Sequence, residues 1–317
     1  MNSKLSIILE KTFIYRCMLL ILLPIYFFAD QYTDTRETLF IFNLLLLILS
    51  SLSFRKVWIQ AILSGVFSLL GEPRFSVMNL HMITFHWITS FTLSAFIMTL
   101  IEKYLNEKRN TFDLITSLAK SLDSRDEYTA FHSQNVANYA RKIAEEMKLS
   151  PRICENIYMG GLLHDIGKIG IAEVLLNKPA TLSEQEYKLI KQHPEIGYNM
   201  VKHIKRFKST GILHMILHHH ERYDGKGYPN GLKGDDIPLE ARIMAVADAF
   251  DAMTSKRVYR NQLVWEDVFT ELNQNKGSQF DPLVVNAFYN VFTKEGSSFM
   301  NKQANPDRNQ TLSLVNG

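Results

Sequence analysis

The N-terminal third of this chain contains long stretches without a single charged residue, and these stretches constrain its fold more than any other feature. Residues 75–101 form an uncharged run of 27 residues. This length exceeds the roughly 20 apolar residues that a helix needs to cross a bilayer. Three shorter apolar runs precede it, at residues 17–29, 38–54 and 57–71. We therefore predict a membrane region at residues 1–101 with four transmembrane helices.

The placement of basic residues predicts how this region is oriented. Lys and Arg residues lie before the first run, between the second and third runs, and after the fourth run. Because positively charged loops stay in the cytoplasm, we expect both the N-terminus and the segment after residue 101 to be cytoplasmic. This predicts a multi-pass protein of the cell inner membrane, with the lipid bilayer as a partner. A cleaved signal peptide is the alternative for the first run, but no small-x-small cleavage site follows Phe28.

The rest of the chain has the composition of a soluble segment and divides into three parts. We expect residues 102–111 to be a short cytoplasmic connector, residues 112–293 to be a folded domain, and the polar residues 294–317 to be a mobile tail. The two cysteines of the chain exclude a disulfide framework. Its 35 Lys and Arg residues nearly balance 32 Asp and Glu residues, so the charge gives no reason to expect a nucleic-acid duplex as a partner.

Helix signals occur throughout the folded domain. Apolar residues recur with a helical period after His132, and Ser150 followed by proline is a typical helix start. Ser183 and Glu186 have capping-box spacing, and the helix that they open should end before Pro194. No clean pair of alternating strands is present, so the predicted fold class is all-α, with the four-helix transmembrane region followed by a helical bundle. Further helices are expected at residues 210–220, 239–254, 265–275 and 282–292.

Histidine residues are concentrated in one stretch of this domain. Eight of the ten histidines lie within residues 132–220, and the same stretch contains the adjacent pair His164 and Asp165. Each neutral imidazole offers one nitrogen lone pair, and a carboxylate between such rings can bridge two cations. The pattern therefore favours a site for two divalent metal ions over a set of ordinary surface histidines. A separate metal pair at His214 and His218, which are four residues apart, is a weaker alternative.

Three motifs follow one another in the order of a known family. Residues 164–168 read HDIGK, residues 219–229 read HHERYDGKGYP, and residues 237–255 contain IPLEAR followed by ADAFDAMTS. The first motif resembles that of the HD-superfamily metal phosphohydrolases, and the other two are similar to motifs of its HD-GYP subgroup. The resemblance extends over about residues 112–292, more than half of the chain, and implies a helical bundle of the HD type.

The resemblance also implies an activity, namely hydrolysis of the bacterial second messenger cyclic di-GMP to linear pGpG or further to GMP. Two cations about 4 Å apart can generate a bridging hydroxide, which would attack the phosphorus in line. Some relatives hold a third metal through a glutamate at the position that Tyr128 occupies here, so we expect two metals. By resemblance, the ligands of one metal are His132, His164, Asp165 and Asp248, and those of the other are His193, His219, His220 and the bridging Asp165.

Other residues are assigned roles around these metals. Lys168 lies one helical turn after His164, so we expect its ammonium group to stabilise phosphoryl oxygens, and we assign Lys168 and Asp165 as catalytic. Asp251, one turn after Asp248, is expected to support the site rather than to bind metal. Mixed nitrogen and oxygen ligands favour Fe or Mn and leave Zn, Mg and Co open. The resemblance assigns five residues to substrate binding, Arg257, Arg260, Gly227, Tyr228 and Pro229.

The sequence leaves alternatives open for function and partners. Another cyclic dinucleotide is the second candidate substrate, and a cyclic di-GMP receptor without turnover is a third reading, which the complete ligand set disfavours. Phe131 and Val258 replace a Gly and a Pro that are usual in the family, and neither change removes a ligand. The short connector leaves no room for a sensor domain, so we expect regulation through the membrane helices or through a partner such as a GGDEF-type or another signalling protein. A homodimer is expected, and a plain membrane tether is the alternative.

Overall fold

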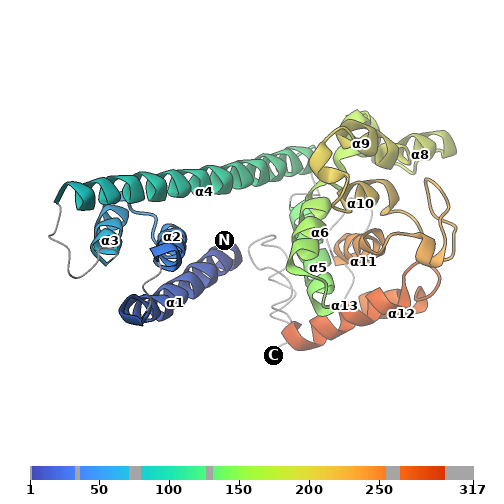
Figure 1. Cartoon of the computed structure of the whole chain (residues 1–317). Coiled ribbons are helices and arrows are strands. Elements are labelled where there is room, and N and C mark those ends of the chain that lie inside the picture. The colour runs from blue at the N-terminus through green and yellow to red at the C-terminus, as the bar shows by residue number, and fades with distance from the viewer. Residues whose placement is uncertain (1, 33–35, 71–79, 126–130, 255–264, 297–317) are drawn as a thin grey trace, which may run out of the picture. The chain divides into compact units, whose positions relative to one another are not determined.

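The structure is a computed structural model, which describes the chain except for residues 1, 33–35, 71–79, 126–130, 255–264 and 297–317 (Figure 1). The described residues form helices and connecting turns without any β-strand, apart from one isolated bridge between Lys276 and Phe280. The chain divides into two compact units, Met1–Asn110 and Thr111–Gly317. The all-α fold class predicted from the sequence is therefore confirmed for the part of the chain that the structure describes.

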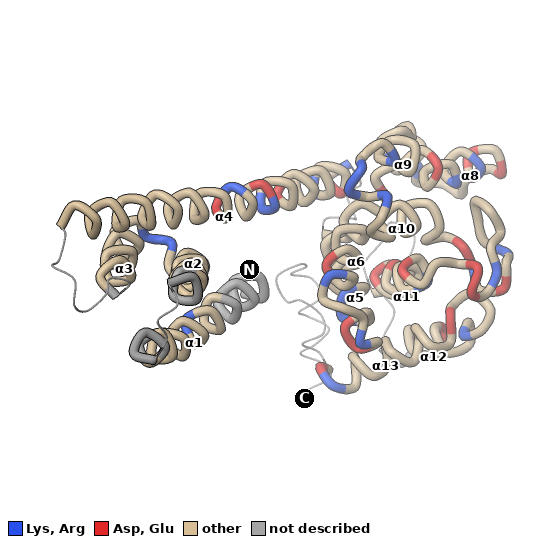
Figure 2. Tube along the Cα trace, viewed as in Figure 1, with Lys and Arg blue, Asp and Glu red and all other residues tan. Residues whose placement is uncertain are grey.

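The first unit consists of helices that coincide with the four uncharged runs. Figure 2 shows that α3 and the N-terminal part of α4 carry no Lys, Arg, Asp or Glu. Within the described residues, α4 alone is long and apolar enough to cross a membrane, while α1, α2 and α3 contain shorter apolar stretches. The arrangement of four membrane spans therefore stays a prediction. The helices are α1 (Asn2–Tyr32), α2 (Arg36–Ser53), α3 (Val57–Leu70) and α4 (Leu80–Asp123).

The second unit begins within α4, so the predicted connector at residues 102–111 lies inside a helix. Within this unit, α5 packs against α6, α11 and α13, and α10 packs against α6, α9 and α11. The longer α-helices of the unit are α5 (His132–Glu146), α6 (Pro151–Leu163), α9 (His193–Val201), α11 (Leu239–Thr254), α12 (Trp265–Gln274) and α13 (Pro282–Glu295). The shorter ones are α7 (Glu173–Leu176), α8 (Glu184–Ile190) and α10 (Ile212–His218), with 3-10 turns η1 (Ile166–Gly170), η2 (Lys205–Phe207) and η3 (Gly234–Asp236).

The core of the second unit explains why α5 is central. Its Tyr139 is fully buried and meets Phe250 of α11 edge-on, with ring centroids 4.9 Å apart. On the other side, a Cβ added at Gly161 of α6 would lie 2.5 Å from the Cα of Ala137. Only glycine therefore allows α6 to approach α5 this closely. This approach brings the end of α6 and the start of α5, which both carry predicted metal ligands, to one place.

Most local helix signals agree with the structure. Ser150 caps α6, and Ser183 and Glu186 form both hydrogen bonds of a capping box at α8. The predicted helices at residues 210–220, 239–254, 265–275 and 282–292 correspond to α10, α11, α12 and α13. The sequence signals do not predict α9, because Pro194 indicates only the end of the preceding helix. Pro194 lies in the first turn of α9, where a helix needs no N–H donor.

Candidate metal centre

The centre is built on the turn that ends α6. His164 is the C-terminal cap of α6, Asp165 follows it, and η1 begins at Ile166. A Cβ added at Gly167 would lie 1.8 Å from the carbonyl oxygen of His193, so only glycine fits where this turn meets the start of α9. The close contact places Asp165 beside His193, although the two residues are far apart in the sequence.

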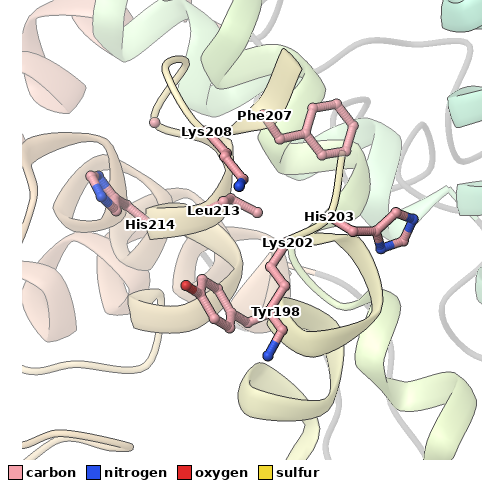
Figure 3. Close-up of a pocket in the computed structure, with 8 residues that line it drawn as sticks. Tyr198, Lys202, His203, Phe207, Lys208, Leu213 and His214 are labelled. Atoms are coloured by element: carbon pink, nitrogen blue, oxygen red, sulfur yellow. The ribbon is translucent and has the colours of Figure 1, made fainter. Parts of the chain in front are cut away.

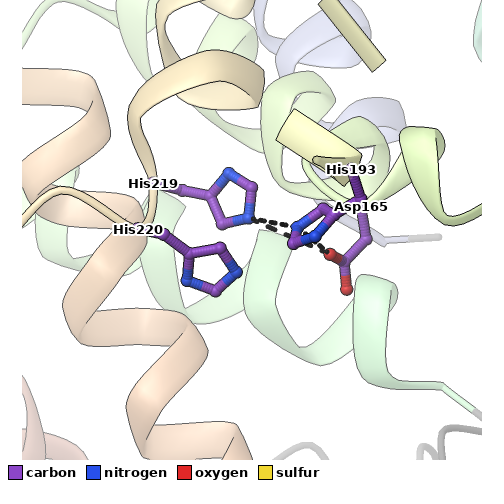
Figure 4. A group of neighbouring side chains, drawn as sticks. All are labelled: Asp165, His193, His219 and His220. Carbon is purple, nitrogen blue, oxygen red and sulfur yellow. Dashed lines mark hydrogen bonds and ion pairs between the residues drawn. The ribbon is translucent and has the colours of Figure 1, made fainter. Parts of the chain in front are cut away.

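The carboxylate of Asp165 lies between two pairs of histidines. Its Oδ1 is 3.2 Å from Nε2 of His193 and 3.9 Å from Nε2 of His219. Its Oδ2 is 3.4 Å from Nε2 of His164 and 3.6 Å from Nε2 of His132. Figure 4 shows Asp165 and His193 meeting the two consecutive histidines that follow α10. A carboxylate with one oxygen directed at each of two imidazole groups has the geometry of a bridging ligand.

The other two predicted ligands complete the cluster. Oδ1 of Asp248, on α11, is 3.4 Å from Nε2 of His132 and 3.9 Å from Nε2 of His164. The ring of His220 lies 4.1 Å from that of His219, centroid to centroid. Two sets of side chains have ligand atoms within 4.8 Å of one another, namely Asp165 with His193, His219 and His220, and Asp165 with His132 and His164. The structure thus brings all seven predicted metal ligands together, with Asp165 common to both sets.

Hydrogen bonds outside the cluster fix the orientation of four of its imidazoles. Each ring uses Nδ1 to donate to a carbonyl or carboxylate oxygen at 2.8–3.0 Å, which leaves Nε2 directed toward the shared space. Metal-binding histidines are held in this way in known sites, because the outer bond selects the tautomer with a free Nε2 lone pair. The acceptors are Asp251 for His132, Gly161 for His164, Ile190 for His193, and Met215 and Ile216 for His219.

The residues present fit divalent metal ions. Nε2 of His164 is buried and makes no hydrogen bond, although a buried polar atom without a partner is costly. Burial lowers the pKa of His220 to about 4 and that of His219 well below its usual value, so both rings are neutral near pH 7 and have a free lone pair. A metal ion would satisfy these nitrogens. The donor set of imidazoles and carboxylates, without a thiolate, suits Fe, Mn or Zn in a mixed-ligand site.

Charges within the centre are strongly coupled. Burial lowers the pKa of His132, but the carboxylates of Asp165, Asp248 and Asp251 outweigh burial and raise it well above the usual value. Burial raises the pKa of Asp165, but the neighbouring charges, first that of Lys168, outweigh it and hold the pKa well below the usual value. Nζ of Lys168 lies 2.5 Å from Oδ2 of Asp165. Asp165 is therefore an ionised carboxylate throughout the physiological pH range.

Two residues near the end of α4 support the centre, and sequence reasoning missed both. The carboxylate of Asp123 caps α5 by accepting from the backbone N–H of Ser133 at 3.1 Å and from its hydroxyl at 2.6 Å, directly beside His132. Arg125 donates to the carbonyl oxygens of Lys168, Ile169 and Ile171, each at 3.3 Å. No local sequence pattern signals either contact, because their partners are 10 and 43–46 residues away.

The glycine-rich loop at residues 224–234 closes over one side of the cluster. The buried carboxylate of Glu221 accepts from the backbone N–H groups of Asn230 at 2.7 Å and Leu232 at 3.1 Å and so holds the loop. A Cβ added at Gly227 would lie 2.3 Å from the backbone nitrogen of Arg222, so glycine is required here. The ring of Tyr228, which precedes Pro229, stacks on that of His220 at 4.8 Å. The predicted substrate-binding residues Arg257 and Arg260, as well as Tyr128, lie outside the described residues.

Comparison with known proteins matches residues 116–284 to the family described as "HD domain". The cyclic di-GMP phosphodiesterase response regulator RpfG of Xanthomonas campestris is 42% identical over 176 residues, which cover 55% of this chain and 46% of that protein. A cyclic di-GMP phosphodiesterase of Thermotoga maritima is 40% identical over 181 residues, 56% of this chain and 48% of that protein. The 3'3'-cGAMP-specific phosphodiesterase 2 of Vibrio cholerae is 37% identical over 173 residues, which cover 55% of this chain and 33% of that protein. The chain thus spans less than half the length of these relatives.

Proposed function

The chain belongs to the HD domain family, and from this premise we propose that it is a metal-dependent phosphodiesterase of the HD-GYP subgroup, which hydrolyses cyclic di-GMP to linear pGpG. The observation that carries the proposal is the Asp165 carboxylate with one oxygen directed at each histidine pair. A phosphodiester resists hydrolysis because its negative charge repels a nucleophile. When bound, two Fe or Mn ions would activate the attacking water and withdraw electron density from the phosphoryl oxygens.

The protein's own contribution is to set the protonation state of individual ligands and to orient four of the imidazole rings. Asp165 stays ionised because Lys168 and the imidazoles outweigh the effect of burial on its pKa. His219 and His220 stay neutral because burial lowers their pKa values. Outer hydrogen bonds such as that from His132 to Asp251 prevent ring rotation. The site is therefore organised before the substrate arrives, as electrostatic catalysis requires.

Lys168 is assigned to the substrate phosphate. Its side chain is 28% exposed, whereas that of its partner Asp165 is 6% exposed, so the ammonium group lies on the solvent side of the buried carboxylate. A phosphodiester that enters from solvent would meet this cation beside the metal centre. Its charge would stabilise the negative charge that develops on the phosphoryl oxygens.

A second substrate has specific support. Among the relatives, the 3'3'-cGAMP-specific phosphodiesterase 2 of Vibrio cholerae is 37% identical, close to the 40% and 42% of the two cyclic di-GMP phosphodiesterases. The two dinucleotides differ in one of their bases, so the metal centre itself does not discriminate between them. We therefore propose 3'3'-cGAMP as the second candidate substrate, after cyclic di-GMP.

We also propose that the first unit lies in the cell inner membrane with four spans. Large apolar side chains face outward from its helices, and its interior contains buried polar side chains beside an apolar cluster. An apolar surface of this extent suits contact with lipid. Oε1 of the fully buried Gln60 accepts from Ser50 at 3.0 Å and from Ser94 at 2.6 Å, which links α3 to α2 and α4. Outward-facing residues include Phe13, Leu20, Ile41, Trp58 and Phe85, each at least 60% exposed.

Turnover by the full-length protein tests the enzymatic proposal. The protein, purified in detergent without oxygen and loaded with Mn or Fe, is incubated with cyclic di-GMP, 3'3'-cGAMP and cyclic di-AMP, and the products are separated by chromatography. We expect linear pGpG to form fastest. Asp165→Asn should abolish turnover, whereas Asp267→Asn, at an exposed position on α12, should leave it unchanged. Exclusive turnover of 3'3'-cGAMP, or activity retained in Asp165→Asn, would contradict the proposal.

A further inference from the structure

A cavity of about 620 Å³ lies between the end of α9 and the start of α10 (Figure 3). None of the seven predicted ligands of the metal centre lines it. Its floor contains Phe207 and Leu213, which are 4% and 9% exposed, and Tyr198 is half-buried beside them. Its rim carries four exposed basic side chains, Lys202, His203, Lys208 and His214. The cavity therefore combines an apolar, partly aromatic floor with a basic rim.

The basic character extends over the sequence around the cavity. Residues 196–220 contain no Asp or Glu, and the segment 202–208 alone contains three Lys and one Arg. One carboxylate approaches from another helix, since a Cβ added at Gly211 would lie 2.8 Å from Oε1 of Glu240. This group offsets one positive charge on the Gly211 side. Lys202 and Lys208 contribute positive charge to the rim from different directions (Figure 3), and Nζ of Lys202 donates to Oδ1 of Asn199 at 2.7 Å. The rim as a whole therefore favours an anion.

We propose that this cavity binds a phosphomonoester joined to a planar aromatic group, the chemistry of a mononucleotide, at a site separate from the metal centre. Lysine is a common ligand of phosphate. The two rim lysines are exposed, so each would turn toward that group as a point charge, and Lys202 would exchange its hydrogen bond to Asn199 for one to the phosphate. The aromatic group would lie against Tyr198 and over Phe207 and Leu213, because burial of an apolar face needs an apolar floor. A bare phosphate would leave that floor without a partner.

The cavity shares two helices with the metal centre. α9 begins at His193 and ends beside Lys202, and α10 begins beside Gly211 and ends at His218, next to His219. The cavity and the centre therefore lie at opposite ends of the same two helices. A mononucleotide in the cavity would contact both helices at the ends that are distant from the predicted metal ligands His193 and His219.

Direct binding of GMP tests the proposal, independently of turnover. Because the metal centre is itself expected to bind phosphate esters, the titration uses full-length protein that carries Asp165→Asn and has been treated with EDTA. Calorimetry should detect GMP binding in this background. Adding Lys202→Ala and Lys208→Ala should weaken it at least tenfold, whereas adding Lys188→Ala, at an exposed lysine of α8, should leave it unchanged.

Two further probes test whether the cavity prefers a mononucleotide to other molecules that carry a phosphate group. Inorganic phosphate represents the bare anion, and glycerol 3-phosphate represents a lipid headgroup. We expect both to bind at least tenfold more weakly than GMP. Equal affinity for the three probes would overturn the assignment to a mononucleotide. No GMP binding in the Asp165→Asn background, or binding that survives loss of both lysines, would overturn the site itself. Unchanged thermal melting of the lysine variant is the check that the fold is intact.

Discussion

The guanidinium group of Arg125 donates a hydrogen bond to the backbone carbonyl of Lys168, so a residue two positions after α4 holds the turn that carries Asp165. Further bonds to Ile169 and Ile171 extend this contact along the same turn. Asp123, at the end of α4, holds the start of α5 in the same way through Ser133. The end of α4 therefore supports both His132 and Asp165.

Loss of the Arg125 side chain should disturb this turn. We expect Arg125→Ala to lower kcat by about 10- to 100-fold, because displacement of catalytic groups by about 1 Å has effects of this size. Arg125→Lys should restore only part of the activity, since one ammonium group cannot reach three carbonyls as a guanidinium does. Steady-state kinetics on the full-length protein measure the change. Arg152→Ala, at an exposed arginine of α6, is the matched control, and equal rates in both alanine variants would contradict the role of Arg125.

Removal of the carboxylate behind His132 should weaken metal binding. Asp251 accepts from Nδ1 of His132 at 2.8 Å and is 1% exposed. Loss of such an outer partner typically lowers metal affinity 10- to 100-fold. We therefore expect Asp251→Ala to lose one of two metals during dialysis against a weak chelator, as measured by elemental analysis. Asp251→Asn keeps an oxygen acceptor and should retain more metal, and full metal content in Asp251→Ala would refute this role.

The backbone before His132 is strained. Phe131, which is 42% exposed, has φ of 75°, a conformation that costs a non-glycine residue about 1–2 kcal/mol. We expect Phe131→Gly to be more stable than Phe131→Ala by about 1 kcal/mol, because both variants lose the ring and only glycine relieves the strain. Thermal melting of the two variants under identical conditions measures the difference. If Phe131→Ala melts at the same temperature or higher, the strain is not present in solution.

Protons should compete with metals unequally at the two sides of the centre. Burial lowers the pKa of His220 to about 4, whereas the carboxylates around His132 outweigh burial and raise its pKa well above the usual value. A raised pKa means that a proton binds at higher pH, so acidification should release the metal at His132 and His164 first. The metal at His219 and His220 should remain until the pH approaches about 4, where the ring of His220 becomes protonated.

Metal content at a series of pH values measures this order. We expect the count to fall from two metals per chain to one in mildly acidic buffer, and to zero only at lower pH. In the His220→Ala variant, the metal that remains at neutral pH should be the acid-sensitive one. Simultaneous loss of both metals, or an acid-resistant metal in His220→Ala, would show that the two sides do not differ as described.

The sequence by itself determined the helical class, most helix starts and the identity of the candidate ligands. Helix signals are local, since the cap at Ser150 and the capping box at Ser183 depend on residues three positions away. The ligands could be named because the histidine-rich motifs resemble those of a known family. The same local signals do not predict the helix that begins at His193, because a proline such as Pro194 can mark the end of one helix or the first turn of the next.

Only the tertiary structure decided how these residues are used. It directed the two oxygens of Asp165 at different histidine pairs, and it placed Asp251 behind His132, which is 119 residues away. It also brought Arg125 onto the turn at Lys168 and left a basic cavity between α9 and α10. Such contacts depend on close packing at glycines such as Gly161 and Gly167, where helices meet without an intervening Cβ. A single sequence carries no periodic signal for them, because packing couples residues by distance in space rather than by position along the chain.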